Sequence, residues 1–211
     1  MRSLIFAALM SAAIPAIAMP AIAQAETRAP KSLLAMSPDA FRTATTVKDD
    51  PLEFHATLST EKAHREGWKI LSPYGHDNHL RAIVDKQSGA VRYEVRQSLR
   101  YWGTQRDYRT AHYMTDQGLR QVALSEARHG QDVCPTTENN LECPLSKTMA
   151  FGVDEAVLRA VAARYQPGAG DGLAFRLKDA TGHDISSGIV PAEAAGLLQA
   201  VDRYRSGLTL S

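Results

Sequence analysis

The chain has 211 residues, with 24 Lys and Arg against 23 Asp and Glu. A net charge this close to zero gives no general attraction for nucleic acid or for an anionic membrane surface, so nucleic acid is not an expected partner. The length suits one domain large enough to bury a sizeable core, once a short targeting segment is set aside.

The N-terminus predicts export from the cytoplasm. Arg2 precedes an apolar run rich in Ala, Leu and Ile, which ends at the small-x-small sequence Ala23-Gln24-Ala25. This pattern is typical of a secretory signal peptide over residues 1–25, and two prolines in the run disfavour a transmembrane anchor. We therefore expect a periplasmic or secreted protein that keeps no integral membrane span after the signal peptide is cleaved.

Residues 26–51 are expected to form a flexible tether before the folded domain. Three prolines and a Ser/Thr/Asp-rich end break any regular pattern there, although Ser37 followed by Pro38 could start one short helix. From Leu52 onward, apolar and polar residues alternate, so a single domain is predicted over residues 52–207.

The most regular stretch of the domain is a hairpin from His79 to Trp102. The run from Val91 to Trp102 has apolar residues at five of its six odd positions and polar residues at five of its six even positions. Such a period of two predicts a long strand with one buried and one solvated face. Gly89 can supply the positive φ that the preceding turn needs.

Further strands are predicted with short polar connections, which favour antiparallel pairing. Their expected ranges are 52–59, 68–71, 108–115, 119–127, 147–152 and 173–178. Two helices are predicted late in the chain, one after Asp154 and one beginning at Pro191. The expected fold is therefore α+β, with a mainly antiparallel twisted sheet on which the two helices of the C-terminal half pack.

The only cysteines, Cys134 and Cys143, flank a polar loop rich in turn-forming residues. In an exported protein this arrangement predicts a structural disulfide, which would stabilise the fold by roughly 2.7 kcal/mol through loop closure. A zinc site is a weaker interpretation, since the spacing is not Cys-x2-Cys and the loop contains no His.

The even positions of the central strand predict a row of arginines. The candidate ligand-binding residues are Arg81, Arg92, Arg96, Arg100 and Trp102. Guanidinium groups about 6.6–7 Å apart along a strand could bind carboxylates or phosphates through bidentate hydrogen bonds. The other interpretation is a solvated sheet face whose arginines pair with nearby acids and discourage edge pairing.

A second candidate site is the group His76, Asp77 and His79. Two imidazoles and a carboxylate could hold zinc and leave a position for water, as in an exported hydrolase. The pattern lacks the helical His-Glu-x2-His context, however, and polar residues beside a strand commonly form turns.

Aromatic side chains gather on two neighbouring predicted strands. Tyr93, Tyr101, Trp102, Tyr108 and Tyr113 could line a ligand groove, or they could pack in the core of the sheet. No nucleophile elbow, phosphate loop or dinucleotide fingerprint occurs in the sequence, so no catalytic residue and no cofactor are predicted.

Together these features favour a non-catalytic binding or structural protein of the bacterial envelope. Its expected partner is another envelope protein or a small anionic ligand, with an aromatic groove as a second possible binding surface. The alternative is a small secreted hydrolase that uses a His/Asp acid–base pair or a metal.

Overall fold

The computed structural model describes residues 31–65, 76–131, 144–168, 170 and 172–208. The predicted signal peptide, the predicted strand 68–71 and both cysteines, Cys134 and Cys143, lie outside the described residues, so the disulfide stays a prediction.

The described residues form ten strands and five helices. The strands are β1 (Thr46–Lys48), β2 (His55–Ser59), β3 (His76–Asp85), β4 (Val91–Tyr101), β5 (Tyr108–Thr115), β6 (Gly118–Ala123), β7 (Glu126–Gln131), β8 (Leu145–Val153), β9 (Leu173–Asp179) and β10 (Ile185–Ile189). The helices are α1 (Lys31–Leu34), α2 (Pro38–Ala44), α3 (Glu61–Arg65), α4 (Glu155–Ala163) and α5 (Pro191–Ser206). None of these described helices combines the length and the apolar character that crossing a membrane requires.

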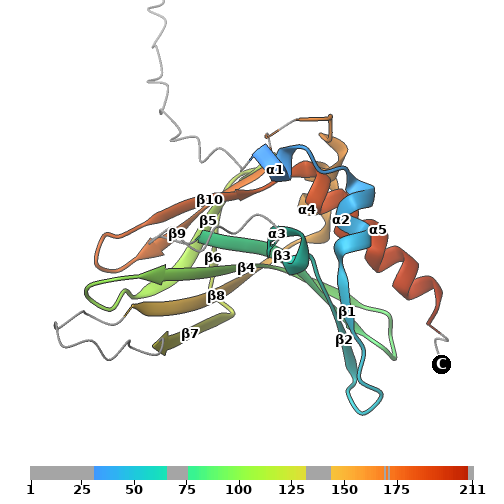
Figure 1. Cartoon of the computed structure of the whole chain (residues 1–211), viewed down its shortest axis with the longest axis horizontal. Helices are drawn as coiled ribbons and strands as arrows, with labels where there is room; N and C mark the ends of the chain where they lie inside the picture. Colours follow the sequence, from blue (N-terminus) through green and yellow to red (C-terminus); the bar gives the residue numbers. More distant parts are fainter. Residues whose placement is uncertain (1–30, 66–75, 132–143, 169, 171, 209–211) are drawn as a thin grey trace, which may run out of the picture.

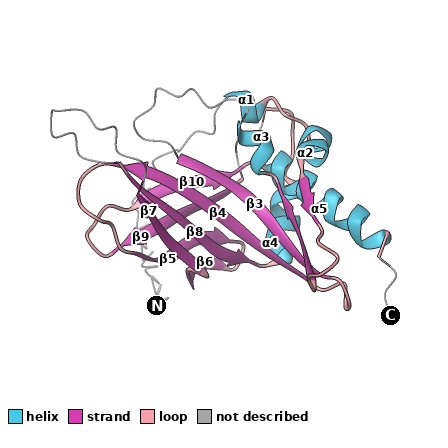
Figure 2. Ribbon diagram, turned by 60° about the horizontal axis from the view of Figure 1, so that its bottom comes forward, coloured by secondary structure: helices cyan, strands magenta, loops and turns pink. Residues whose placement is uncertain are grey.

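The strands form two antiparallel sheets with helices at one end (Figure 1). A six-stranded sheet has the order β1-β2-β3-β4-β8-β7, and a four-stranded sheet has the order β10-β9-β5-β6. The two sheets pack face to face: the ring of Phe151 on β8 stacks on Tyr113 of β5 and meets Phe175 of β9 edge-on. The α+β prediction is confirmed, with the strands divided between two sheets (Figure 2).

The long strand β4 has the two faces that its sequence predicts. Tyr93, Val95, Gln97, Leu99 and Tyr101 are all buried, and these odd positions face the four-stranded sheet. The even positions are exposed or partly exposed, except for one buried glutamate, which is described below. The turn before β4 contains Gly89 at a φ of 69°, as expected for a residue that must adopt positive φ.

The predicted strand 119–127 is in fact two strands that belong to different sheets. β6 pairs with β5 in the four-stranded sheet, whereas β7 pairs with β8 in the six-stranded sheet. The change occurs between two residues: the backbone N–H of Leu124 donates to Arg109, and that of Ser125 donates to Ala150. The alternation of side chains continues through this corner, so the sequence pattern alone gives no sign of it.

Much of the segment expected to be a flexible tether folds onto the domain. Ser37 caps α2 by accepting a hydrogen bond from the Ala40 backbone N–H, and Phe41 of α2 is fully buried. Helix α2 packs on α5 at Gly196, where an added Cβ would lie 2.5 Å from the Cβ of Phe41. The tether prediction failed here because one buried aromatic residue and one glycine 155 positions later make the contact, which local composition cannot show.

The two predicted helices of the C-terminal half are present. The stripe Ala194, Leu197, Leu198 and Val201 of α5 is buried, as its spacing predicts. Asp154 precedes α4, but its carboxylate makes no cap hydrogen bond, because it pairs with Arg120 of β6 instead. The strand β10, which leads into α5, was not anticipated from the sequence.

The contact between α2 and α5 predicts an unusual response to a Gly→Ala substitution. In most helix interiors this change stabilises by about 1 kcal/mol, but Gly196→Ala should destabilise by about 1–3 kcal/mol, since its methyl would overlap α2. The free energy of unfolding from chemical denaturation measures the effect. Gly207→Ala is the control, since a Cβ added there would lie an ordinary 3.5 Å from the Tyr204 carbonyl oxygen. A stabilised Gly196→Ala would contradict the docking of α2.

Candidate functional site

The predicted arginine row lies on the side of the six-stranded sheet that faces away from the four-stranded sheet. We call this side the outer face. Strand register places Arg81 of β3 opposite Glu94 of β4, and Arg96 of β4 opposite Ala150 of β8. Ala150 in turn lies opposite Glu126 of β7. The outer face therefore joins residues from four strands, β3 and β4 of the central hairpin and β7 and β8 from later in the chain.

Small residues on β8 let side chains from either side of it meet. The outer-face positions of β8 are Ser146, Thr148, Ala150 and Gly152. Because Ala150 is short, the carboxylate of Glu126 reaches across β8 and accepts a hydrogen bond from Arg96 at 3.1 Å. The same carboxylate accepts a longer hydrogen bond, of 3.4 Å, from Arg81.

Two buried or nearly buried glutamates organise the arginines. Glu94, which is 4% exposed, accepts hydrogen bonds from Nε and Nη2 of Arg81 at 3.1 and 2.5 Å. Nε of Arg92 lies 3.6 Å from Glu94, and Nε of Arg128 lies 3.1 Å from Glu126. Arg81 and Arg96 are therefore held in place, whereas Arg92 and Arg128 have side chains that are 66% and 79% exposed.

The outer face carries more positive than negative charge. Its arginines are Arg81, Arg92, Arg96, Arg100 and Arg128, and its carboxylates are Asp77, Asp85, Glu94 and Glu126. The excess lies toward β4 and β7, because Asp77 and Asp85 lie at the two ends of β3. Trp102 follows β4 and is 40% exposed. Of the residues predicted to bind a ligand, the structure therefore brings the four arginines onto one surface.

The predicted aromatic groove is mostly core. Tyr93, Tyr101, Tyr108 and Tyr113 are all buried, which fits cross-strand packing better than a wall of exposed rings. Tyr101 accepts a hydrogen bond from the Arg106 backbone N–H. Tyr108 donates one to the carbonyl oxygen of His183.

The predicted metal-binding residues lie at the start of β3, which makes them strand residues and not the loop residues that composition predicted. Asp77 and His79 are two positions apart, so both project to the outer face. The backbone of His76 pairs with Leu99, but its side chain lies outside the described residues. Within the described part of the chain, no group of three or more His, Cys, Asp or Glu side chains has a geometry that could hold a metal ion.

A buried acid–base cluster that sequence reasoning missed lies beside His79. Glu193, in the first turn of α5, is only 1% exposed. Its Oε1 accepts hydrogen bonds from the Thr60 hydroxyl at 2.6 Å and from the Leu80 backbone N–H at 3.0 Å. Nε2 of His64 on α3 lies 3.1 Å from the same oxygen. The two side chains therefore form a buried ion pair.

The environment fixes the charges in this cluster. Burial alone would raise the pKa of Glu193, but the attraction of His64 and the hydrogen bonds hold that pKa below its ordinary value. Burial alone would lower the pKa of His64, and the charge of Glu193 outweighs it, so this pKa is raised. For His79, burial dominates over the nearby carboxylates and lowers the pKa to about 4. A charged pair and a neutral imidazole therefore lie side by side at pH 7.

His79 is the least satisfied member of the cluster. It is 3% exposed, and its Nδ1 has no hydrogen-bond partner among the described residues. The side chain faces Arg96 across the strand pair, and Glu193, Glu61, His64 and Arg96 are the charges that act on it. One signal for the cluster is visible in the sequence: a glutamate on the apolar stripe of α5, beside Ala194 and Leu197.

Comparisons of this chain with protein-family models, with curated proteins and with solved structures find no match.

The neutral state of His79 predicts a loss of stability in acid. Its pKa is about 4 in the folded protein and about 6.5 when unfolded, so the unfolded state takes up the proton first as pH falls. Stability contributed by His79 is fully present above pH 6.5 and should drop by about 2–3 kcal/mol between pH 6.5 and 4.5. The free energy of unfolding, measured across this range, should fall less steeply for His79→Gln than for the native protein.

His183→Gln is the control. Because His183 is exposed, this substitution should leave the decrease in the free energy of unfolding in acid unchanged. His64 has the opposite effect on the pH dependence. Because its pKa is raised in the folded protein, the stability that its protonated form contributes is lost as pH rises above 6.5. Equal slopes for the native protein and His79→Gln would contradict the burial of a neutral His79.

Proposed function

We propose that this protein is an exported, non-catalytic binding protein whose outer face binds an anionic partner that carries carboxylate or phosphate groups. The observation that carries the proposal is the grouping of five arginines with four carboxylates on one sheet face, where Arg92 and Arg128 keep largely exposed side chains. Two of these carboxylates, Glu94 and Glu126, are nearly buried and hold Arg81 and Arg96 in fixed positions.

The chemistry of arginine supports this function. Each guanidinium offers five N–H donors in a planar fork that matches carboxylate and phosphate oxygens. Arg92 and Arg128 each contact a glutamate through Nε, so their outer N–H groups still point toward solvent, in keeping with their high exposure. Holding Arg81 and Arg96 in place lowers the entropy that binding would otherwise cost.

The alternative reading, an ion-pair network that only stabilises the sheet, makes a different prediction. Such a network should be close to neutral, because an unpaired charge near a protein surface gains nothing for stability. The excess of arginine over carboxylate, together with the short residues of β8, leaves a positively charged strip between β4 and β7. That strip favours a ligand over a purely structural role.

The compartment is part of the proposal and is supported by the signal-peptide pattern of residues 1–25. A hydrolase that used His76, Asp77 and His79 receives less support. The His79 ring is almost fully buried on the outer face, so a substrate could not reach it without displacement of the elements packed there.

Titration with citrate and with tripolyphosphate tests the proposed site. We expect saturable binding by calorimetry, with an affinity that decreases as salt concentration rises. The double variant Arg92→Gln/Arg128→Gln should weaken anion binding at least tenfold, because it removes two guanidinium groups of the site. Both side chains are exposed, so their loss leaves the fold intact.

The charge-matched control is Arg109→Gln/Arg176→Gln, which removes two exposed arginines from the four-stranded sheet. It should bind both anions as the native protein does. The proposal is wrong if neither anion binds in a salt-dependent manner, or if both double variants lose affinity equally.

A further inference from the structure

The two sheets end in edge strands, which differ in how they are protected. An exposed edge is a row of unpaired backbone N–H and C=O groups that can pair with another strand, so proteins shorten, charge or cover their edges. Among the described strands, the edges are β1 and β7 of the six-stranded sheet, and β10 and β6 of the four-stranded sheet. Each of the four is therefore a possible site of strand pairing.

Three of these edges are protected. β1 is short, with the three residues Thr46–Lys48. β7 carries two charged side chains, Glu126 and Arg128, beside its edge. β10 is partly covered by β3, where the Asn78 side chain donates a hydrogen bond of 2.6 Å to the carbonyl oxygen of Gly188. Shortness, charge and covering all discourage the addition of another strand.

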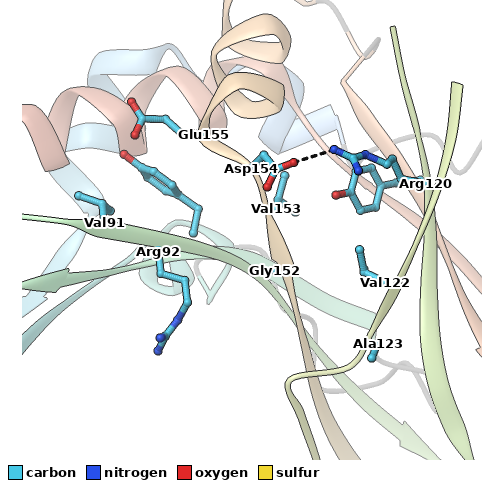
Figure 3. A pocket seen from close by; sticks show the side chains of 11 residues that line it. Val91, Arg92, Arg120, Val122, Ala123, Gly152, Val153, Asp154 and Glu155 are labelled. Atoms are coloured by element: carbon cyan, nitrogen blue, oxygen red, sulfur yellow. Dashed lines mark hydrogen bonds and ion pairs between the residues drawn. The ribbon is translucent and has the colours of Figure 1, made fainter. Parts of the chain in front are cut away.

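The edge strand β6 lacks these protections. It spans six residues, most of them exposed, and contains no proline. Its one charged side chain, Arg120, is paired with Asp154 at 3.0 Å, on the side of β6 that faces the six-stranded sheet (Figure 3). In the described part of the chain, the backbone of β6 pairs with β5 alone. The opposite edge of β6 is therefore open.

The backbone groups of alternate β6 residues point away from β5. Hydrogen-bonded and non-hydrogen-bonded residues alternate along an antiparallel pair. The backbone N–H of Leu124 donates to the carbonyl oxygen of Arg109 at 3.0 Å, which fixes this alternation for the register of β5 and β6. The even-numbered residues of β6 therefore bond to β5, and the outward backbone groups belong to Leu119, Gln121 and Ala123.

An exposed apolar pair borders the open edge. Leu119 is 65% exposed and lies opposite Met114 of β5, which is 56% exposed. Both side chains lie on the side of the four-stranded sheet that faces away from the six-stranded sheet. A strand that paired with β6 would cover part of this apolar surface and would also satisfy the outward backbone groups.

From these observations we infer that β6 pairs with β6 of a second copy of this chain, antiparallel, about a two-fold axis at Gln121. This register sets Leu119 opposite Ala123 of the second copy, so the exposed leucine gains an apolar neighbour. It sets Arg120 opposite Val122, which keeps the two arginines apart. The two glutamine amides meet on the axis, where each can both donate and accept a hydrogen bond.

The sequence of β6 disfavours the neighbouring registers. An axis at Arg120 would place this arginine opposite itself, and like charges directly opposite each other destabilise a sheet. An axis at Val122 would pair fewer residues, because β6 ends at Ala123. One register thus makes β6 complementary to its own copy, which is why a second copy is the inferred partner. A two-fold dimer uses both β6 edges, so it closes and does not grow into a fibre.

Sedimentation equilibrium of the full protein tests the dimer. A single strand pair is a small interface, so we expect a monomer–dimer equilibrium whose dimer fraction rises between about 5 and 500 μM. Gln121→Lys should weaken dimerisation at least tenfold, because it places two positive charges opposite each other on the axis. The side chain of Gln121 is exposed, so the monomer should remain folded.

Gln117→Lys is the matched control. It makes the same chemical change in the exposed turn before β6. The two copies of residue 117 would lie far from the axis and from each other, so this variant should dimerise as the native protein does.

Cysteine cross-linking tests the register. In the inferred dimer, residue 121 lies opposite itself, whereas the two copies of residue 119 are about 13–14 Å apart along the strands. A disulfide requires Cα atoms about 4.4–6.8 Å apart. With oxidised glutathione, Gln121→Cys should therefore form a covalent dimer, whereas Leu119→Cys and the native protein should not.

Four results would overturn the inference. The native protein could remain monomeric up to about 500 μM, or it could associate beyond a dimer. Gln121→Lys and Gln117→Lys could dimerise equally, or Leu119→Cys could cross-link as readily as Gln121→Cys. Each result is distinct from a failure of the anion experiment, because that experiment measures binding at the outer face of the other sheet.

Discussion

The position of the helices depends on one buried carboxylate. Oε1 of Glu193 gathers the hydroxyl of Thr60, the backbone N–H of Leu80 and the imidazole of His64. These groups come from the end of β2, from β3 and from α3. Oε1 of Glu193 therefore connects the first turn of α5 to the six-stranded sheet. Burying a charge is costly unless it is paired and hydrogen-bonded, which explains why so many partners converge on it.

The remaining helical contacts follow from this attachment. Once the first turn of α5 is fixed, its buried stripe covers the end of the core, and Gly196 presents a flat surface on which α2 can lie. His64 is also within ring-contact distance of Phe41, so α3 touches both α2 and α5. The helices are thus coupled to one another through the same small region, and a change in its charge should be felt across the whole helical layer.

The proposed anion-binding surface arises from the same strand alternation that builds the core. Odd positions of β4 from Tyr93 to Tyr101 face the other sheet and are buried in the core. Even positions carry arginines to the outer face, where the short residues of β8 allow Glu126 to hold them. One strand therefore contributes to the core and to the outer face, through its two opposite faces.

The sequence predicts what is local and misses what depends on distant contacts. The two faces of β4 and the buried stripe of α5 follow from periodicity, so both were predictable. Three other features were not predictable: the division of 119–127 between two sheets, the docking of Phe41, and the burial of Glu193 and His79. Each depends on a partner far along the chain, and a glutamate in a first helical turn is usually explained by the helix dipole alone. Likewise, nothing near Arg96 in the sequence indicates that Glu126 will reach it.

A double-mutant cycle on His64 and Glu193 tests the role of the buried pair most directly. Unfolding free energies at pH 7 are needed for the native protein, His64→Gln, Glu193→Gln and the double variant. If the charged pair holds the helical layer, Glu193→Gln alone should cost about 3–5 kcal/mol, and the two changes should be coupled by more than about 1 kcal/mol. Additive effects, with coupling below about 0.5 kcal/mol, would contradict the account.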